Sequence, residues 1–202
     1  MRLYSVPGWG STIVEIMLAL AGEPYDFVNV DGFDRPGPAR DRLQAINPLA
    51  QVPTLVLEDG LILTESAAIA LWLVGRHPQL APAAGSAEHA RFLRLLVWYV
   101  ANVYPTFTYG DYPERWAPSA PVELVAATDR RREELYLWLE TQLAGPFACG
   151  ERVTVLDAYI ACVISWRPRR DWFAEHTPTL LAVAERVRAL PQVAPVMARS
   201  GL

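Results

Sequence analysis

The chain has 202 residues, 52% of them hydrophobic, which is enough for a packed core in one domain or in two small ones. Its formal net charge is −4, and every basic residue is an arginine. We expect no nucleic-acid partner, because proteins that bind a phosphate backbone usually carry a basic surplus. The N-terminus has no apolar signal core and no run is apolar for long enough to span a bilayer, so we also expect a cytoplasmic protein with no membrane partner.

The first 76 residues alternate between strand-like and helix-like segments. Apolar residues at i, i+3, i+4 and i+7 from Ile13 predict an amphipathic helix that ends near Gly22. Asp59-Gly60 between two apolar runs is typical of a tight hairpin turn. The predicted elements of this half are, in order, a strand over 2–5, the helix over 13–22, a strand over 25–30, a short helix over 39–46, a hairpin over 54–63 and a helix over 65–74.

The rest of the chain reads as a linker followed by helices. Residues 77–86 hold two prolines and a glycine and form the linker, and residues 87–202 form an all-helical region. The first long helix runs over 88–104, and we expect Pro105 to kink or end it. Another long helix covers 122–143, and Pro178 and Pro191 suit the first turns of two final helices.

Thr154 and Asp157 stand in the spacing of a capping box, in which each residue bonds the backbone N–H of the other. We expect this motif to stabilise the start of a helix. Cys149 and Cys162 share no metal-binding spacing and are interpreted as buried free thiols. The three histidines are scattered singly, so no metal is expected.

The sequence Asn47 to Leu55 carries the most informative feature of the chain, a proline directly before a strand. Pro53 cannot donate to a ladder, so it belongs at the first residue of the strand or at a bend, where a cis bond is common. A cis bond would turn the N–H and C=O of Val52 outward, where an extended peptide can pair with them.

Glu65 and Ser66 follow shortly afterwards, at the start of a predicted helix. They offer a carboxylate, a hydroxyl and free N–H groups, a set that suits an amino-acid head group carrying both charges. Together with Val52-Pro53, this pair resembles the glutathione-binding half of the cytosolic glutathione transferases. In that family the valine-proline step holds the cysteinyl backbone of glutathione, and the Glu-Ser pair holds its γ-glutamyl end.

The resemblance extends over the whole chain and implies a fold. It implies an α/β domain followed by an all-α domain: a thioredoxin-like N-terminal domain over 1–76 and an all-helical C-terminal domain over 87–202. The segment from Gly150 to Tyr159 resembles the helix-capping segment of the family's helical domain. The start of the chain looks most like the bacterial beta class, which has a cysteine where this chain has Gly10. A mixed disulfide between the protein and glutathione at that position is therefore excluded.

The resemblance also implies that the thiol of bound glutathione becomes a thiolate. Lowering a thiol pKa from about 8.5 to about 6.5 requires roughly 2.7 kcal/mol, and one charged hydrogen bond supplies about 1.5 to 3 kcal/mol. Ser11 follows Pro7-Gly8-Trp9-Gly10 at the predicted start of the first helix, where family members place their activating residue. It is the expected catalytic residue, although it also suits a helix cap. Alternative donors are Thr12, Tyr4, Ser5 and backbone amides.

Further glutathione contacts and a substrate pocket are expected from the family pattern. Arg35 and Gln51 are candidates for the glycine carboxylate of glutathione. The pocket for a hydrophobic electrophile would be lined by Trp9, Tyr104 and Phe107, although aromatic residues at helical spacing more often belong to a core.

Three functional hypotheses follow. The first is a glutathione transferase that uses glutathione as a co-substrate, needs no metal and forms a homodimer. The second is a non-catalytic interaction or ligand-binding protein on the same fold, which the missing cysteine favours and the intact Glu65-Ser66 pair disfavours. The third, a glutaredoxin-like oxidoreductase, is disfavoured because no cysteine precedes Cys149.

Overall fold

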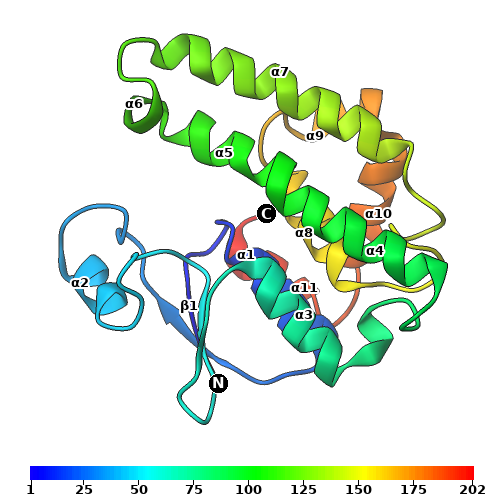
Figure 1. Cartoon of the computed structure of the whole chain (residues 1–202), viewed down its shortest axis with the longest axis horizontal. Helices are drawn as coiled ribbons and strands as arrows, with labels where there is room; N and C mark the ends of the chain where they lie inside the picture. The colour runs from blue at the N-terminus through cyan, green and yellow to red at the C-terminus, as the bar shows by residue number, and fades with distance from the viewer. The chain divides into compact units, whose positions relative to one another are not determined.

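The chain forms two compact units, described over all residues from 1 to 202 by a computed structural model (Figure 1). The first unit combines Met1–Leu80 with Arg186–Leu202, and the second is Ala81–Glu185. These units differ from the predicted division at 76 and 87 in one main respect, because the C-terminal residues belong to the first unit. None of the helices has the length and apolar character that a membrane-crossing segment needs.

The first unit has the expected β-α-β-α-β-β-α order of a thioredoxin-like domain. Its elements are β1 (Arg2–Ser5), α1 (Thr12–Ala21), β2 (Asp26–Asn29), α2 (Pro38–Gln44), β3 (Thr54–Val56), β4 (Ile62–Leu63), α3 (Ser66–Arg76) and the C-terminal α11 (Ala194–Ser200), with a short 3₁₀ turn at Pro78–Leu80. The strand order is β2-β1-β3-β4. β1 pairs in parallel with β2 and antiparallel with β3, and β3 pairs antiparallel with β4.

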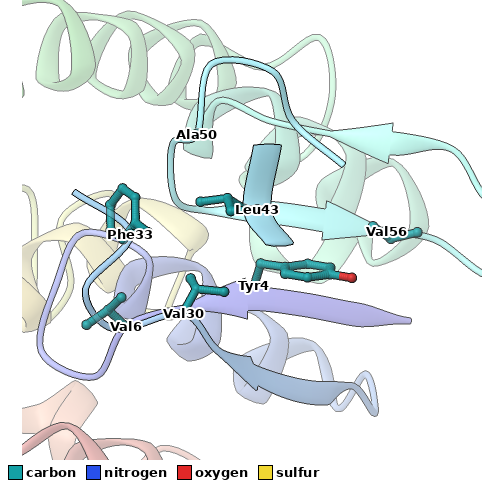
Figure 2. Close-up of a cluster of buried hydrophobic side chains, with 7 residues drawn as sticks. All are labelled: Tyr4, Val6, Val30, Phe33, Leu43, Ala50 and Val56. Atoms are coloured by element: carbon teal, nitrogen blue, oxygen red, sulfur yellow. The ribbon is translucent and has the colours of Figure 1, made fainter. Parts of the chain in front are cut away.

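Strand alternation divides the core of this unit between the two faces of the sheet. Leu3 and Leu55 are paired and fully buried on one face, while their neighbours Tyr4 and Val56 point to the other. Figure 1 shows α2 on the side of β1 away from α1 and α3. Figure 2 shows the buried cluster that includes Leu43 of α2. The members of this cluster are Tyr4, Val6, Val30, Phe33, Leu43, Ala50 and Val56.

The second unit is helical. Its elements are α4 (Ala87–Trp98), a π-helical turn η2 (Tyr99–Val103), α5 (Tyr104–Asp111), α6 (Pro113–Trp116), α7 (Pro121–Glu140), α8 (Val155–Val163), α9 (Arg170–His176) and α10 (Pro178–Arg188), whose last turn passes into the first unit.

The helical chain does not end at Pro105, so that part of the prediction is corrected. Pro105 lies in the first turn of α5, directly after the π-helical turn, and α5 continues to Asp111. Because Pro105 has no N–H, one backbone hydrogen bond is missing where the π-helical turn passes into α5.

The predicted capping box at the start of α8 is confirmed. Asp157 Oδ2 accepts hydrogen bonds from the backbone N–H and the hydroxyl of Thr154 at 2.7 and 2.8 Å. Its other oxygen accepts the N–H of Ala148 at 2.7 Å, which ties the preceding loop to the helix. Burial outweighs these bonds and raises the pKa of Asp157 to about 6.

Candidate functional site

Val52 and Pro53 form the loop that leads into β3, and the bond between them is cis. Neither the N–H nor the C=O of Val52 takes part in a hydrogen bond within the chain, and its side chain packs partly buried against the cluster of Figure 2. The backbone of Val52 therefore remains available to an extended ligand.

Asn47 supports this loop from inside the protein. Its buried side-chain amide donates to the carbonyl of Gln51 at 3.2 Å and to Thr54 Oγ1 at 3.1 Å, and its Oδ1 accepts the N–H of Leu49 at 3.1 Å. Thr54 Oγ1 in turn donates to the Gln51 carbonyl at 2.8 Å. Asn47 stands in the informative segment but received no predicted role. The only sequence signal was an Asn before Pro, which is typical of a turn.

Glu65 lies beside this loop because of the register of the hairpin. Leu55 pairs with Leu63, so Pro53 and Glu65 each stand two residues beyond this pair, at the same end of the hairpin. Glu65 directly precedes α3 and has a φ of 62°, a left-handed conformation that is uncommon for a residue with a side chain. Its exposed carboxylate makes no hydrogen bond or ion pair within the chain. Such local strain is a recognised mark of functional positions.

Ser66 is the first residue of α3 and is half-buried. The structure therefore brings together four of the predicted glutathione contacts: Val52, Pro53, Glu65 and Ser66. They present an unpaired backbone, a carboxylate and a helix start at one end of the β3–β4 hairpin. Positive and negative groups of one small ligand would both find partners here.

The turn between β1 and α1 is held by buried hydroxyls. Ser11 Oγ accepts the N–H of Val6 at 3.0 Å and lies 2.8 Å from Ser5 Oγ. Thr12 Oγ1 accepts the N–H of Gly8 at 3.0 Å. The side chains of Ser5, Ser11 and Thr12 are all fully buried. In contrast, the N–H groups of Gly10 and Ser11 donate to no group in the chain.

A buried carboxylate stands behind this turn. Glu15 is fully buried in the first part of α1, and its Oε1 accepts the hydroxyl of Ser5 at 2.7 Å. Its Oε2 accepts the Nε of Arg199 at 3.2 Å and the hydroxyl of Tyr25 at 3.3 Å. Burial and the Glu15 charge raise the pKa of Tyr25 to about 12. Sequence reasoning missed this group, although Glu15 is the one charged residue of an otherwise apolar helix.

The remaining candidates of the first unit are more exposed. The side chain of Arg35 is 80% exposed and lies 3.9 Å from Asp34, the one partner recorded for it. Gln51 is exposed beside Val52. Trp9 is half-buried and packs edge-to-face on Phe33 with ring centroids 5.4 Å apart. The roles predicted for these three residues remain predictions.

Tyr104 and Phe107 belong to the second unit, where they join an aromatic cluster with Trp166. Ring centroids in this cluster lie 5.0 to 6.4 Å apart. The fully buried guanidinium of Arg132 stacks 4.1 Å from the Phe107 ring centroid. The prediction that Trp9, Tyr104 and Phe107 line one pocket remains a prediction.

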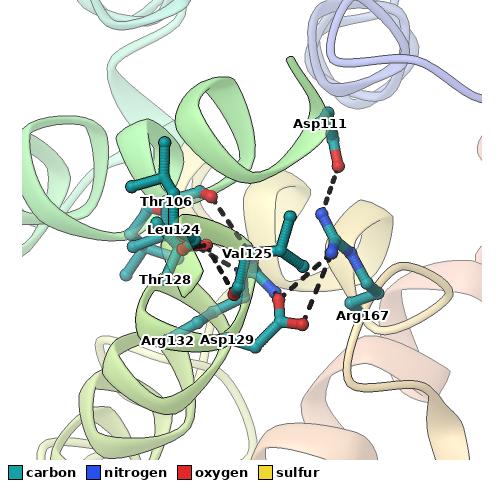
Figure 3. Close-up of polar contacts among 9 residues, drawn as sticks. Thr106, Asp111, Leu124, Val125, Thr128, Asp129, Arg132 and Arg167 are labelled. Atoms are coloured by element: carbon teal, nitrogen blue, oxygen red, sulfur yellow. Dashed lines mark hydrogen bonds and ion pairs between the residues drawn. The ribbon is translucent and has the colours of Figure 1, made fainter. Parts of the chain in front are cut away.

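Figure 3 shows how Arg132 is held. It donates to the hydroxyl and the carbonyl of Thr106 at 2.9 and 3.0 Å and pairs with Asp129 at 2.6 Å. Arg167 also bonds Asp129 and forms an ion pair with Asp111. The buried guanidinium of Arg132, which lies where α5 packs against α7, is therefore paired with a carboxylate, as burial of an ion requires.

Cys149 is half-buried and Cys162 is buried, and both are free thiols. Burial raises the pKa of the Cys149 thiol to about 12, so this thiol stays protonated at neutral pH. This protonation further disfavours a mechanism that uses the chain's own cysteine. No three His, Cys, Asp or Glu side chains are grouped as ligands for a metal ion.

Comparisons with known proteins agree on one family. The model for the glutathione S-transferase N-terminal domain matches residues 11–75. The chain is 51% identical over 201 residues to the GST-like protein YncG of Escherichia coli K12, covering 99% of this chain and 98% of that one. A glutathione transferase homologue from Sulfitobacter with bound glutathione has a TM-score of 0.86 at 26% identity, covering 100% and 98% of the two chains. The bacterial beta-class glutathione S-transferase of Sphingomonas chungbukensis has a TM-score of 0.79 at 26% identity, covering all of both chains.

Proposed function

We propose that this chain, which belongs to the glutathione S-transferase family, binds glutathione and activates its thiol for attack on a hydrophobic electrophile or a disulfide. The observation that carries this proposal is the juxtaposition of the unpaired Val52 backbone with the strained, unpartnered Glu65. Solved relatives with bound glutathione support the choice of ligand.

Each part of the tripeptide has a proposed partner. The backbone of Val52 pairs with the cysteinyl residue as an added strand would. The Glu65 carboxylate takes the α-ammonium of the γ-glutamyl residue, and Ser66 with the first N–H groups of α3 takes its α-carboxylate. Arg35 and Gln51 are proposed for the glycine carboxylate, since Arg35 is exposed and Gln51 adjoins Val52.

We propose Ser11 as the donor to the thiolate. Rotation of its O–H bond would redirect the hydrogen from its acceptors inside the turn, Ser5 Oγ and the Val6 carbonyl, to sulfur while Ser11 Oγ still accepts the Val6 N–H. Because Ser11 is fully buried in the free protein, the Pro7–Gly10 turn has to move for sulfur to reach it. The unpaired N–H groups of Gly10 and Ser11 are the alternative donors at the same helix start.

The electrophile is proposed to be a flat hydrophobic compound that Trp9, Tyr104 and Phe107 contact. A homodimer in the cytoplasm is proposed as the working form. Exposed apolar side chains at the β4 edge and on α3, namely Leu61, Ile62 and Leu71, support an interface on the first unit.

Calorimetric titration of the folded protein with glutathione tests the proposal directly. We expect saturable binding below millimolar concentration, and absence of binding would reject it. Conjugation of an aromatic halide and reduction of a glutathionylated thiol then separate enzyme from binding protein. Turnover that Ser11→Ala reduces by about tenfold or more supports Ser11 as the donor. Binding without turnover in either assay would favour the non-catalytic alternative.

A further inference from the structure

Four side chains connect the C-terminal helix to the turn where the thiol is proposed to be activated. Arg199 of α11 binds Glu15, Glu15 binds Ser5, and Ser5 contacts Ser11. All of these residues belong to the first unit. The activation role of this turn rests on the proposed function, but the connection itself does not.

The direction of each hydrogen bond in this connection is set from the Arg199 end. Partial burial acts to lower the pKa of Arg199, but its hydrogen bonds to Glu15 and the charge of Glu15 outweigh this and raise it, so Arg199 stays a cation and forms an ion pair with Glu15. An ionised carboxylate only accepts hydrogen bonds. Ser5 has a single hydroxyl hydrogen, and its 2.7 Å contact with Glu15 therefore uses it.

Ser5 Oγ is then left as an acceptor for its second neighbour. Its 2.8 Å contact with Ser11 then uses the hydrogen of Ser11, because the other acceptor near that hydrogen, the Val6 carbonyl, is farther away at 3.4 Å. Ser11 Oγ in turn accepts the N–H of Val6, which closes the turn after β1. The charge on Glu15 thus determines which way the hydroxyl of Ser11 points in the free protein.

A second contact places α11 against the same turn. Thr12 Oγ1, which accepts the Gly8 N–H, lies 3.4 Å from Ser200 Oγ. A Cβ on Gly8 would lie 3.0 Å from the carbonyl oxygen of Ser200, so only a residue without a side chain fits there. Both Arg199 and Ser200 therefore support the turn.

We infer that Arg199 is a positioning residue for thiol activation, acting through Glu15 and Ser5 on the orientation of Ser11 and on the Val6–Gly10 turn. Without its cation, Glu15 would be a buried charge with only hydroxyl partners, which destabilises the arrangement around it. Ser5 would then no longer have a fixed acceptor for its hydrogen. The hydroxyl of Ser11 would then no longer have a fixed direction, and its bond with the Val6 N–H would weaken.

The test compares Arg199→Met with a matched control, Arg76→Met. Arg76 pairs with Glu23 at 2.9 Å in the same unit, and Glu23 follows the end of α1 opposite to the turn, so this is another Arg–Glu pair to break. For each variant we would measure the thermal midpoint, the apparent pKa of the bound glutathione thiol from its thiolate absorbance, and hydrogen exchange at the Val6 amide.

We expect Arg199→Met to raise the thiol pKa by about one unit and to speed Val6 exchange about tenfold or more. Arg199→Lys should recover most of both effects, and Arg76→Met should change neither. If Arg199→Met does not fold, Glu15→Gln, which keeps the size of the side chain, replaces it with the same expectation.

An unchanged thiol pKa in a variant that merely melts earlier would overturn the inference. If the wild-type protein does not bind glutathione, the proposed function fails and Val6 exchange alone decides whether Arg199 positions the turn. Exchange equal to that of Arg76→Met would then reject it.

Discussion

Leu55 pairs with Leu63 across the antiparallel β3–β4 hairpin, two residues after Pro53 on one side and two residues before Glu65 on the other. Pro53, which follows the unpaired Val52, and Glu65, which has a strained backbone and directly precedes α3, therefore lie at the same end of the hairpin. The connecting hairpin fixes their spacing, because an antiparallel register is set by its tight turn and its buried face. The binding geometry proposed for glutathione depends on this relationship.

Glu65 should show a conflict between stability and binding. Glu65→Gly relieves the left-handed backbone conformation at φ 62° and should raise the free energy of unfolding by about 1 kcal/mol. The same variant loses the carboxylate and should weaken glutathione binding at least tenfold. Denaturant unfolding and calorimetric titration measure the two effects. Glu58→Gly, an exposed position on the same hairpin, is the control for the lost charge, and equal loss of affinity there would contradict the assignment.

Asn47→Ala should destabilise the loop before β3. The change removes two donated bonds and leaves the carbonyl of Gln51 with one partner fewer, at a cost of about 1 to 3 kcal/mol in unfolding free energy. Glutathione affinity should fall as well, since Val52 is presented by this loop. An unfolding free energy and a glutathione affinity both equal to those of the wild type would show that Asn47 does not support the site.

Because the pKa of Asp157 is raised, we expect the stability of the protein to depend on pH in a particular way. Burial raises its pKa in the folded state to about 6 from the ordinary value of 3.8, so the folded state binds this proton more tightly than the unfolded state. The contribution of Asp157 to stability is therefore greatest below about pH 4 and is lost as pH rises through about 6. The span is on the order of 3 kcal/mol.

Asp157→Asn removes this titration and is the test of that dependence. Its unfolding free energy should lack the decline between about pH 4 and pH 6 that the wild type shows. Parallel pH profiles of the two proteins would indicate that another group is responsible.

Two helical glycines should respond oppositely to alanine. At Gly110 in α5 a Cβ would lie 2.8 Å from Thr128 Oγ1 and 3.1 Å from Arg167, inside the network of Figure 3. Gly110→Ala should lower the unfolding free energy by about 1 to 3 kcal/mol. Gly75 in α3 has no atom within 4 Å of such a Cβ, so Gly75→Ala should raise it by about 0.5 to 1 kcal/mol. Thermal unfolding distinguishes them, and a stabilised Gly110→Ala would contradict this packing.

Parts of both units could be predicted because their signals are local. Pro53 before an apolar run, Asp59-Gly60 at a turn and the capping pair Thr154 and Asp157 each act within a few residues, and the structure confirms these elements. For Pro105 the sequence left two outcomes open, a kink or an end of the helix; a π-helical turn interrupts the helix directly before Pro105, and the helix continues beyond it.

The sequence by itself determined the family and the end of the hairpin where glutathione is proposed to bind, since those features lie close together along the chain. Only the tertiary structure decided how the hydroxyls of the β1–α1 turn are used. Ser11 was predicted as a donor at a helix start, and the fold buries it against Ser5 and Val6. Arg199 lies 184 positions after Glu15 in the chain and acts on this turn through its contact with Glu15. No local sequence pattern predicts such a contact. A buried charge needs a partner from wherever the fold supplies one, and here the C-terminal helix supplies it.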